Sequence, residues 1–190
     1  VDIPISLMFF AMTAMWVAML LFGVNPWIGI IAALAYGLST YFLLIIGAGH
    51  ITKMWAVVYA PLMVAGCYYT LRKNVWVGAA LTALFTSLEI GANHPQISYY
   101  FLLVMVAMWL SEAFYAQRQK LMKDFLKRTA ILVAAGVVAL GSNLSPLWYT
   151  MQHSKETTRG GSELVERDAE SGQQGLDIEY ATAWSYGPVE

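Results

Sequence analysis

Residues 55–74 read WAVVYAPLMVAGCYYTLRKN, and this stretch decides the fold class. Its first part, Trp55–Leu71, is an apolar run without a charged side chain, and it stops at Arg72-Lys73-Asn74. A run of about 17–25 apolar residues crosses the hydrocarbon core of a bilayer as a helix, and Lys and Arg collect in the loops on its cytoplasmic side. We therefore interpret the stretch as a membrane-spanning helix followed by a short turn.

The rest of the chain has the same apolar character. Of its 190 residues, 58% are hydrophobic and 12% are charged, whereas about 25% are charged in a typical soluble domain. The net charge of −1 gives no reason to propose a nucleic-acid partner. Cys67 is the single cysteine, which excludes a disulfide framework and indicates a buried, inert thiol. Between residues 3 and 97 the charged side chains are Lys53, Arg72, Lys73 and Glu89.

Six segments have the length and composition of membrane spans, and short breaks separate most of them. These breaks predict antiparallel hairpins, so the fold class is an all-α polytopic transmembrane bundle over residues 1–153. The polar residues 154–190 are interpreted as the start of an extracytoplasmic loop or small domain, and the whole chain as an internal fragment of a longer membrane protein. No internal repeat is evident. The predicted spans are Ile3–Phe22, Trp27–Ile46, Trp55–Leu71, Val75–Ala92, Ile97–Tyr115 and Thr129–Tyr149.

The basic residues predict the orientation of these spans. Arg72 and Lys73 follow the third span, and five more Lys or Arg lie in the loop 117–128 after the fifth. Both loops are placed in the cytoplasm. Residues 117–128 form either an amphipathic stretch on the inner leaflet or a solvated extension of two helices. In this orientation the three histidines lie at the outer ends of the spans, on one side of the membrane: His50, His94 and His153.

The first candidate site is the outer loop Gly47-Ala-Gly-His-Ile-Thr-Lys53. Its glycines allow close backbone approach, His50 titrates near neutral pH, and Lys53 suits a phosphate. The alternative is an ordinary loop in which Lys53 extends to the lipid head groups.

The second candidate joins Glu89 to Asn93-His94-Pro95-Gln96. A carboxylate inside a membrane normally faces the bundle interior or a wet cavity. The functional interpretation is a substrate or acid–base pocket. The alternative is a structural ion pair, with Lys53 as the partner of Glu89, or a hydrogen bond that fixes the hairpin.

The third candidate is Arg159, which precedes Gly160-Gly161 and therefore combines a guanidinium with flexible backbone amides. Such a group grips a phosphate or carboxylate, while a flexible hinge is the alternative. The histidines lack metal-ligand spacing, so no metal site is predicted. The residues indicate no cofactor, and they do not decide whether a divalent metal ion binds.

Several motifs resemble the YfhO family of bacterial polytopic membrane proteins, and the resemblance covers essentially the whole chain. The family is similar to the GT-C class of integral-membrane glycosyltransferases. The motifs are Gly49-His50-Ile51-Thr52-Lys53, Asn93-His94-Pro95-Gln96, Arg159-Gly-Gly-Ser-Glu-Leu164, Gly175-Leu176-Asp177 and Trp184-Ser185-Tyr186-Gly187.

The resemblance implies transfer of a sugar from a polyprenyl-phosphate carrier, with inversion, at the extracytoplasmic face of the bacterial cytoplasmic membrane. It also implies an acidic catalytic residue in the first extracytoplasmic loop, which this piece is expected to follow, so the catalytic residue is unknown. The partners are then the lipid bilayer and a lipid-linked sugar. A transporter or flippase, and a non-catalytic subunit that docks a partner, are the alternatives. The implied substrate-binding residues are His50, Lys53, Glu89, His94 and Arg159.

Overall fold

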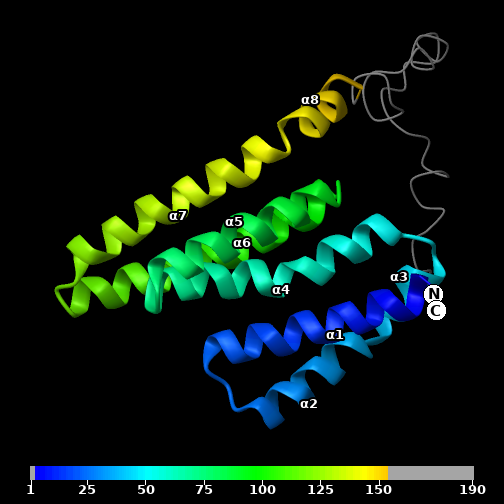
Figure 1. Cartoon of the computed structure of the whole chain (residues 1–190), viewed down its shortest axis with the longest axis horizontal. Helices are drawn as coiled ribbons and strands as arrows, with labels where there is room; N and C mark the ends of the chain where they lie inside the picture. Colours follow the sequence, from blue (N-terminus) through cyan, green and yellow to red (C-terminus); the bar gives the residue numbers. More distant parts are fainter. Residues whose placement is uncertain (1–2, 154–190) are drawn as a thin grey trace, which may run out of the picture. The chain divides into compact units, whose positions relative to one another are not determined.

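The structure is a computed structural model, and it describes residues 3–153 as helices joined by short turns, without a strand among them (Figure 1). This confirms the predicted all-α class. The chain divides into two compact units, residues 1–147 and 148–190. The helices are α1 (Ile3–Phe22), α2 (Pro26–Gly37), α3 (Thr40–Gly47), α4 (Ile51–Arg72), α5 (Val75–Gly91), α6 (Pro95–Arg118), α7 (Met122–Ser142) and α8 (Leu144–His153).

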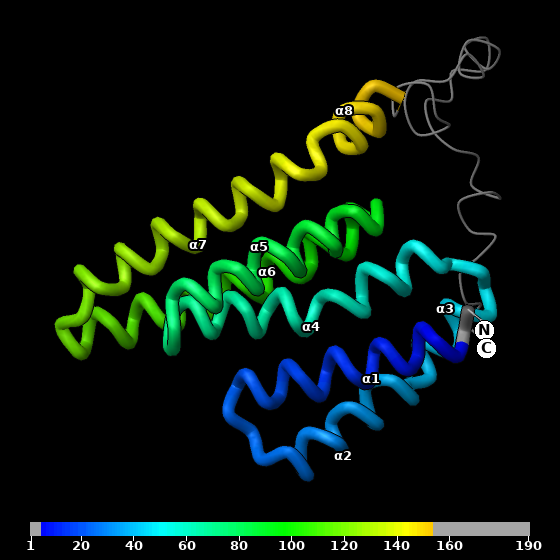
Figure 2. The backbone as a smooth tube through the Cα atoms, viewed as in Figure 1, coloured from blue at the N-terminus to red at the C-terminus, as the bar shows by residue number. Residues whose placement is uncertain are grey.

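The helices of the first unit run back and forth, as the short breaks predicted, except that α3 continues in the direction of α2 (Figure 2). The turns 48–50 and 92–94 lie at one end of these helices, which we call the histidine end. The turns 23–25, 73–74 and 119–121 lie at the opposite end, which we call the basic end. Five segments are long and apolar enough to cross a membrane, namely Ile5–Phe22, Pro26–Gly47, Ile51–Arg72, Pro95–Arg118 and Met122–Ser142. The apolar α5 is shorter, with 17 residues.

Helix α4 is the centre of the first unit. It packs against α1, α3, α5, α6 and α7. Within its most apolar window 72% of the residues are buried, compared with 11–28% in the other four segments. The outward residues of those four are large and hydrophobic, as expected of helices that face lipid rather than water. The apolar run Trp55–Leu71 therefore belongs to the helix that these five neighbours surround.

The closest helix contact joins α4 to α5 through two matching glycines. A Cβ atom on Gly78 would lie 2.2 Å from the backbone nitrogen of Thr70, and one on Gly66 would lie 2.7 Å from that of Thr82. Each threonine hydroxyl donates a 2.9 Å hydrogen bond to the glycine carbonyl four residues earlier in its own helix. Small residues at this spacing let helix backbones meet, which drives helix association where lipid removes the hydrophobic effect.

A proline in α4 leaves one backbone carbonyl without its helical partner. Pro61 has no N–H, so the carbonyl of Val57 receives no hydrogen bond from residue 61. The Tyr36 hydroxyl of α2 donates to that carbonyl at 2.8 Å. Tyr36 also packs edge-on against Phe42 of α3. The unsatisfied carbonyl thus attaches α2 to the central helix, because an unpaired polar group inside a bilayer is costly.

Two predicted spans differ from the structure. The span Trp27–Ile46 is divided into α2 and α3 by a break at Leu38-Ser39. The span Thr129–Tyr149 was predicted at the wrong place, because its helix begins at Met122 and ends at Ser142. At the second break the amide of Asn143 donates to the Ala139 carbonyl at 3.0 Å and so competes with the backbone.

At the basic end two arginines connect helices. The Arg128 guanidinium of α7 donates to the carbonyls of Thr70 and Lys73 at 3.0 and 2.9 Å, so it caps the end of α4. Arg72 pairs with Glu112 of α6. Because α6 continues to Arg118 and α7 begins at Met122, residues 117–128 are mostly the ends of these two helices. The extension of two helices, rather than a separate amphipathic stretch, is the alternative that the structure supports.

We predict that Gly78→Ala lowers the free energy of unfolding by about 1–3 kcal/mol, because its methyl group would displace the backbone of α4. Gly141→Ala is the matched control, since nothing lies within 4 Å of a Cβ atom at that position. Thermal unfolding of the purified protein in detergent measures both effects. Equal midpoints for the two variants would contradict the close contact of α4 and α5.

We also predict that Tyr36→Phe costs about 0.5–1.5 kcal/mol in the wild-type background, because the Val57 carbonyl loses its donor. In the Pro61→Ala background residue 61 regains an N–H, so the same substitution should cost less. A double-mutant cycle on unfolding free energies measures the difference. Additive effects would show that the tyrosine does not compensate for the proline.

Candidate functional site

Two turns at the histidine end have the same construction. Gly47-Ala48-Gly49-His50 joins α3 to α4, and Gly91-Ala92-Asn93-His94 joins α5 to α6. In each, glycine ends the first helix, alanine follows in the right-handed region and histidine is the N-cap residue of the next helix. The two turns therefore share a four-residue pattern, Gly-Ala-Gly/Asn-His, which is too short to count as an internal repeat of the sequence.

The third residue of each turn allows the chain to reverse direction within a few residues. Gly49 has φ +76° and Asn93 has φ +56°, so both lie in the left-handed region. Glycine and asparagine adopt that region at the lowest cost, and they commonly end helices there. The next residue is then the N-cap of the following helix. The shared backbone form places His50 and His94 at equivalent positions of two helices that run in the same direction.

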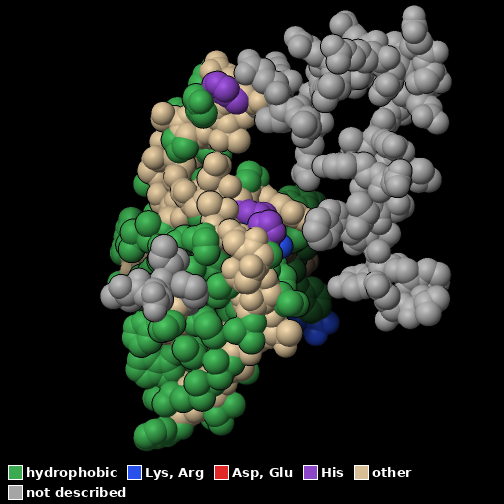
Figure 3. All heavy atoms as spheres, turned by 90° about the vertical axis from the view of Figure 1, so that its right-hand side faces the viewer, with side chains coloured by type: hydrophobic (Ala, Val, Ile, Leu, Met, Phe, Trp, Pro, Cys, Tyr) green, Lys and Arg blue, Asp and Glu red, His purple; other side chains and the backbone are tan. Residues whose placement is uncertain are grey.

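A single hydrophobic cluster brings these two turns to the same end of the unit. Ile97, two residues after Pro95, belongs to the cluster that also contains Met54 and the packed side chain of Ile51. Figure 3 faces this end and shows histidine side chains on its surface. His50 is exposed. The Nδ1 atom of His94 is buried and has no hydrogen-bond partner within the described part of the chain.

Glu89 is the buried charge of the site. It is 1% exposed, and its Oε1 atom accepts a 3.0 Å hydrogen bond from the hydroxyl of Ser98 on α6. The predicted pair with Lys53 is not formed among residues 3–153, because the Lys53 ammonium lies 5.2 Å from the centre of the Tyr41 ring. Burial without a cation is unfavourable for a carboxylate, which marks this position as a functional candidate.

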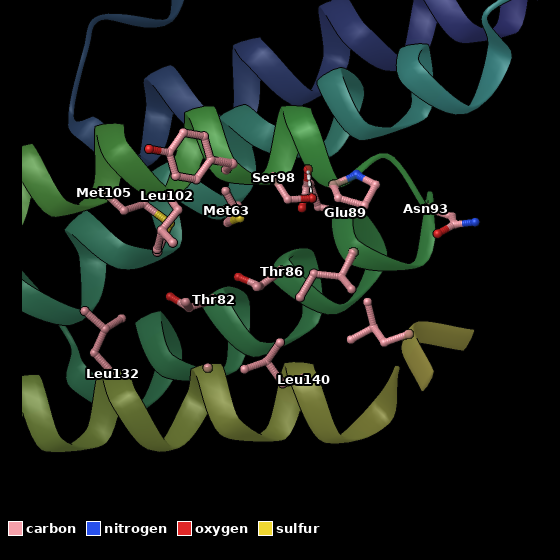
Figure 4. A pocket seen from close by; sticks show the side chains of 15 residues that line it. Met63, Thr82, Thr86, Glu89, Asn93, Ser98, Leu102, Met105, Leu132 and Leu140 are labelled. Atoms are coloured by element: carbon pink, nitrogen blue, oxygen red, sulfur yellow. Dashed lines mark hydrogen bonds between the residues drawn. The ribbon is translucent and has the colours of Figure 1, made fainter. Parts of the chain in front are cut away.

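Glu89 lines a cavity of about 400 Å³ between α4, α5, α6 and α7. Figure 4 shows Thr82, Thr86 and Glu89 along α5, with Leu132 and Leu140 of α7 across the cavity. The remaining lining is mainly apolar and includes Met63, Leu102, Met105 and Leu147. The cavity is therefore apolar along its length and has a carboxylate and hydroxyls on one wall, a composition that fits a ligand with an apolar chain and a polar group.

The predicted site residues are only partly brought together. Glu89 lines the cavity and His94 stands between two of its lining residues, Asn93 and Pro95. The lining does not include His50 or Lys53, although both belong to the same end of the unit. Arg159 lies outside the described residues. His153 is in the other unit, where its Nδ1 is 3.0 Å from the Tyr149 carbonyl.

The sequence interpretation missed three hydroxyl residues of the cavity: Thr82, Thr86 and Ser98. Thr86 Oγ1 is buried without a hydrogen-bond partner among the described residues. The signal was present, because residues 82, 86 and 89 follow the four- and three-residue spacing of one helix face. The described residues contain no group of three acidic, cysteine or histidine side chains able to hold a metal.

Comparison with known proteins adds no relative: no family model, no curated protein and no solved structure matches the chain.

We predict that the third residues of the two turns are exchangeable. Gly49→Asn and Asn93→Gly should keep the unfolding midpoint close to that of the wild type, because both residue types adopt positive φ. Gly49→Ile should lower stability by about 1–2 kcal/mol, since a β-branched side chain is strained there. Thermal unfolding measures all three variants. A stable Gly49→Ile protein would show that the left-handed turn is not required.

Proposed function

We propose that the chain belongs to a YfhO-type, GT-C-like glycosyltransferase that uses a polyprenyl-phosphate-linked sugar. The observation that carries this proposal is the cavity beside Glu89, which combines an apolar lining with a buried carboxylate and hydroxyls. A lipid-linked sugar has the same two parts, a hydrocarbon chain and a polar head. An apolar cavity between membrane helices admits such a chain from the surrounding lipid without exposing it to water.

In this proposal the role of each site residue follows from its charge. Lys53 and Arg159 neutralise the carrier phosphate as negative charge develops on the leaving group. His50 and His94 stand at the N-termini of α4 and α6, where the helix dipole also favours an anion. Glu89 and the two histidines position the sugar or the acceptor. The catalytic acid expected from the family lies outside this set.

The same proposal places the protein in the bacterial cytoplasmic membrane. α5 adds a sixth span to the five longer ones, and residues 154–190 extend on the extracytoplasmic side. The basic end faces the cytoplasm, which agrees with Arg72, Arg118 and Lys123 at that end. The histidine end then faces outward, where a lipid-linked sugar would be consumed.

A membrane transporter or flippase is the second candidate, and one observation favours it. The apolar segment Pro26–Gly47 is interrupted at Leu38-Ser39, and transporters build their binding sites from such interrupted helices. The break, however, does not border the cavity of Glu89, whose lining contains no residue of α2 or α3. A non-catalytic subunit is less well supported, because residues on both sides of His94 line a cavity.

We predict that Lys53→Ala, His94→Ala and Arg159→Ala each reduce sugar transfer by the full-length protein about 10-fold or more, and that Glu89→Gln does the same. Glu89→Gln keeps a carbonyl that accepts the Ser98 hydrogen bond, so its loss of activity would reflect charge rather than folding. Transfer is measured from the amounts of lipid-linked sugars and surface glycans in cells that carry each variant.

Two matched controls accompany this experiment: Lys123→Ala removes an exposed lysine from the basic end, and His153→Ala an exposed histidine outside the cavity. Both should transfer sugar at the wild-type rate. Wild-type transfer in all four site variants would refute the site assignment. Movement of the intact lipid-linked sugar between leaflets, without transfer, would support the transporter.

A further inference from the structure

A second depression lies on another face of α5 at the histidine end. It has a volume of about 490 Å³ and is lined by residues of the first turns of α4, the last turns of α5 and the residue after α7. Ser87 and Gly91 of α5 line this depression, and neither lines the cavity of Glu89. We call this depression the aromatic groove, because Trp55 and Tyr59 form one wall.

The two aromatic rings stand one helical turn apart and are stacked, with centroids 5.6 Å apart and planes 18° from parallel. The Trp55 indole N–H and the Tyr59 hydroxyl have no hydrogen-bond partner among residues 3–153. A wall of this kind offers apolar ring surface together with polar groups at its margins. It suits a ligand that has both C–H faces and hydroxyl groups.

The opposite side of the groove has a fixed hydrogen-bond acceptor. Asn143 is 7% exposed, and its Nδ2 group donates to the carbonyls of Ser87 and Ala139 at 2.9 and 3.0 Å. These bonds hold the amide in one orientation, in which Oδ1 accepts no hydrogen bond from the described part of the chain. A Cβ atom on Gly91 would lie 3.2 Å from Oδ1. Glycine at this position therefore keeps the acceptor open.

Every residue that lines the groove within the described part of the chain is uncharged. A phosphate or carboxylate would enter without a counter-charge, at the cost of its desolvation. A neutral polyhydroxylated ligand avoids that cost, because its hydroxyls can donate to Asn143 Oδ1 and accept from the Trp55 N–H. Among ligand classes, uncharged saccharides combine these hydroxyls with apolar faces that pack on aromatic rings.

We propose that the aromatic groove binds an uncharged saccharide unit through Trp55, Tyr59 and the carbonyl oxygen of Asn143. As a refinement it rests on the proposed glycosyltransferase function, in which the groove would hold the sugar of an acceptor while the cavity of Glu89 holds the lipid donor. The saccharide-binding claim itself requires neither donor nor catalysis, so the two proposals can fail separately.

The test measures binding of free maltose and N-acetylglucosamine to the full-length protein in phospholipid nanodiscs, by saturation-transfer NMR and titration. Glucose 6-phosphate serves as the charged probe. We expect the neutral sugars to bind and the phosphate to bind more weakly. Trp55→Leu should weaken neutral-sugar binding about fivefold or more, because it removes the ring surface. Gly91→Val should weaken it similarly by covering Asn143 Oδ1.

Trp76→Leu and Gly141→Val are the matched controls, because Trp76 is 72% exposed at the start of α5 and position 141 has open space around it. Both should bind sugar as the wild type does. The proposal is overturned if the wild type binds no neutral sugar, if glucose 6-phosphate binds at least as tightly, or if both groove variants bind like the controls. Sugar binding in a protein that transfers no sugar in cells would support the groove and refute the transferase function.

Discussion

The contact between α4 and α5 is the constraint on which the rest of the structure depends. Gly66 and Gly78 let the two backbones approach until each glycine faces the threonine of the other helix. Within a bilayer, apolar side chains gain little from meeting each other rather than lipid, so close backbone packing must hold the helices together. The hydroxyls of Thr70 and Thr82 each donate a hydrogen bond to a carbonyl of their own helix. These two side chains therefore leave no unpaired hydroxyl in the interface.

This contact determines where the two candidate sites can lie. Because α5 is held against α4 along one side, its remaining faces turn toward α6 and α7 and toward the start of α4. One face presents Thr86 and Glu89 to the apolar cavity, and another presents Ser87 and Gly91 to the aromatic groove. Both depressions end near the turn at Asn93, where the chain reverses into α6. A single helix thus separates the apolar cavity, where we propose that a lipid binds, from the aromatic groove, where we propose that a saccharide binds.

Polar groups inside the unit are of two kinds. Some have a hydrogen-bond partner on another helix and so hold two helices together. The Val57 carbonyl accepts from the Tyr36 hydroxyl, and the Thr70 carbonyl near the end of α4 accepts from Arg128. Others have no such partner among the described residues, and these include Thr86 Oγ1 and His94 Nδ1. Unpartnered groups cost stability, since neither water nor protein replaces the missing hydrogen bond. They gather around the cavity of Glu89, which is where a bound ligand would supply the missing partners.

The sequence alone determined the helical class, the positions of most helix ends and the gathering of His50, Lys53 and His94 at one end. These features follow from local rules, because apolar length, turn residues and basic loops act within a few residues of each other. Tertiary structure alone decided that Gly66 faces Thr82 and Gly78 faces Thr70, that Lys53 lies over Tyr41 rather than beside Glu89, and that Asn143 interrupts the last predicted span. Each of these depends on which helix faces cross in space. A pattern of apolar residues that must all face lipid or neighbouring helices does not encode that choice, because almost every face of such a helix is hydrophobic.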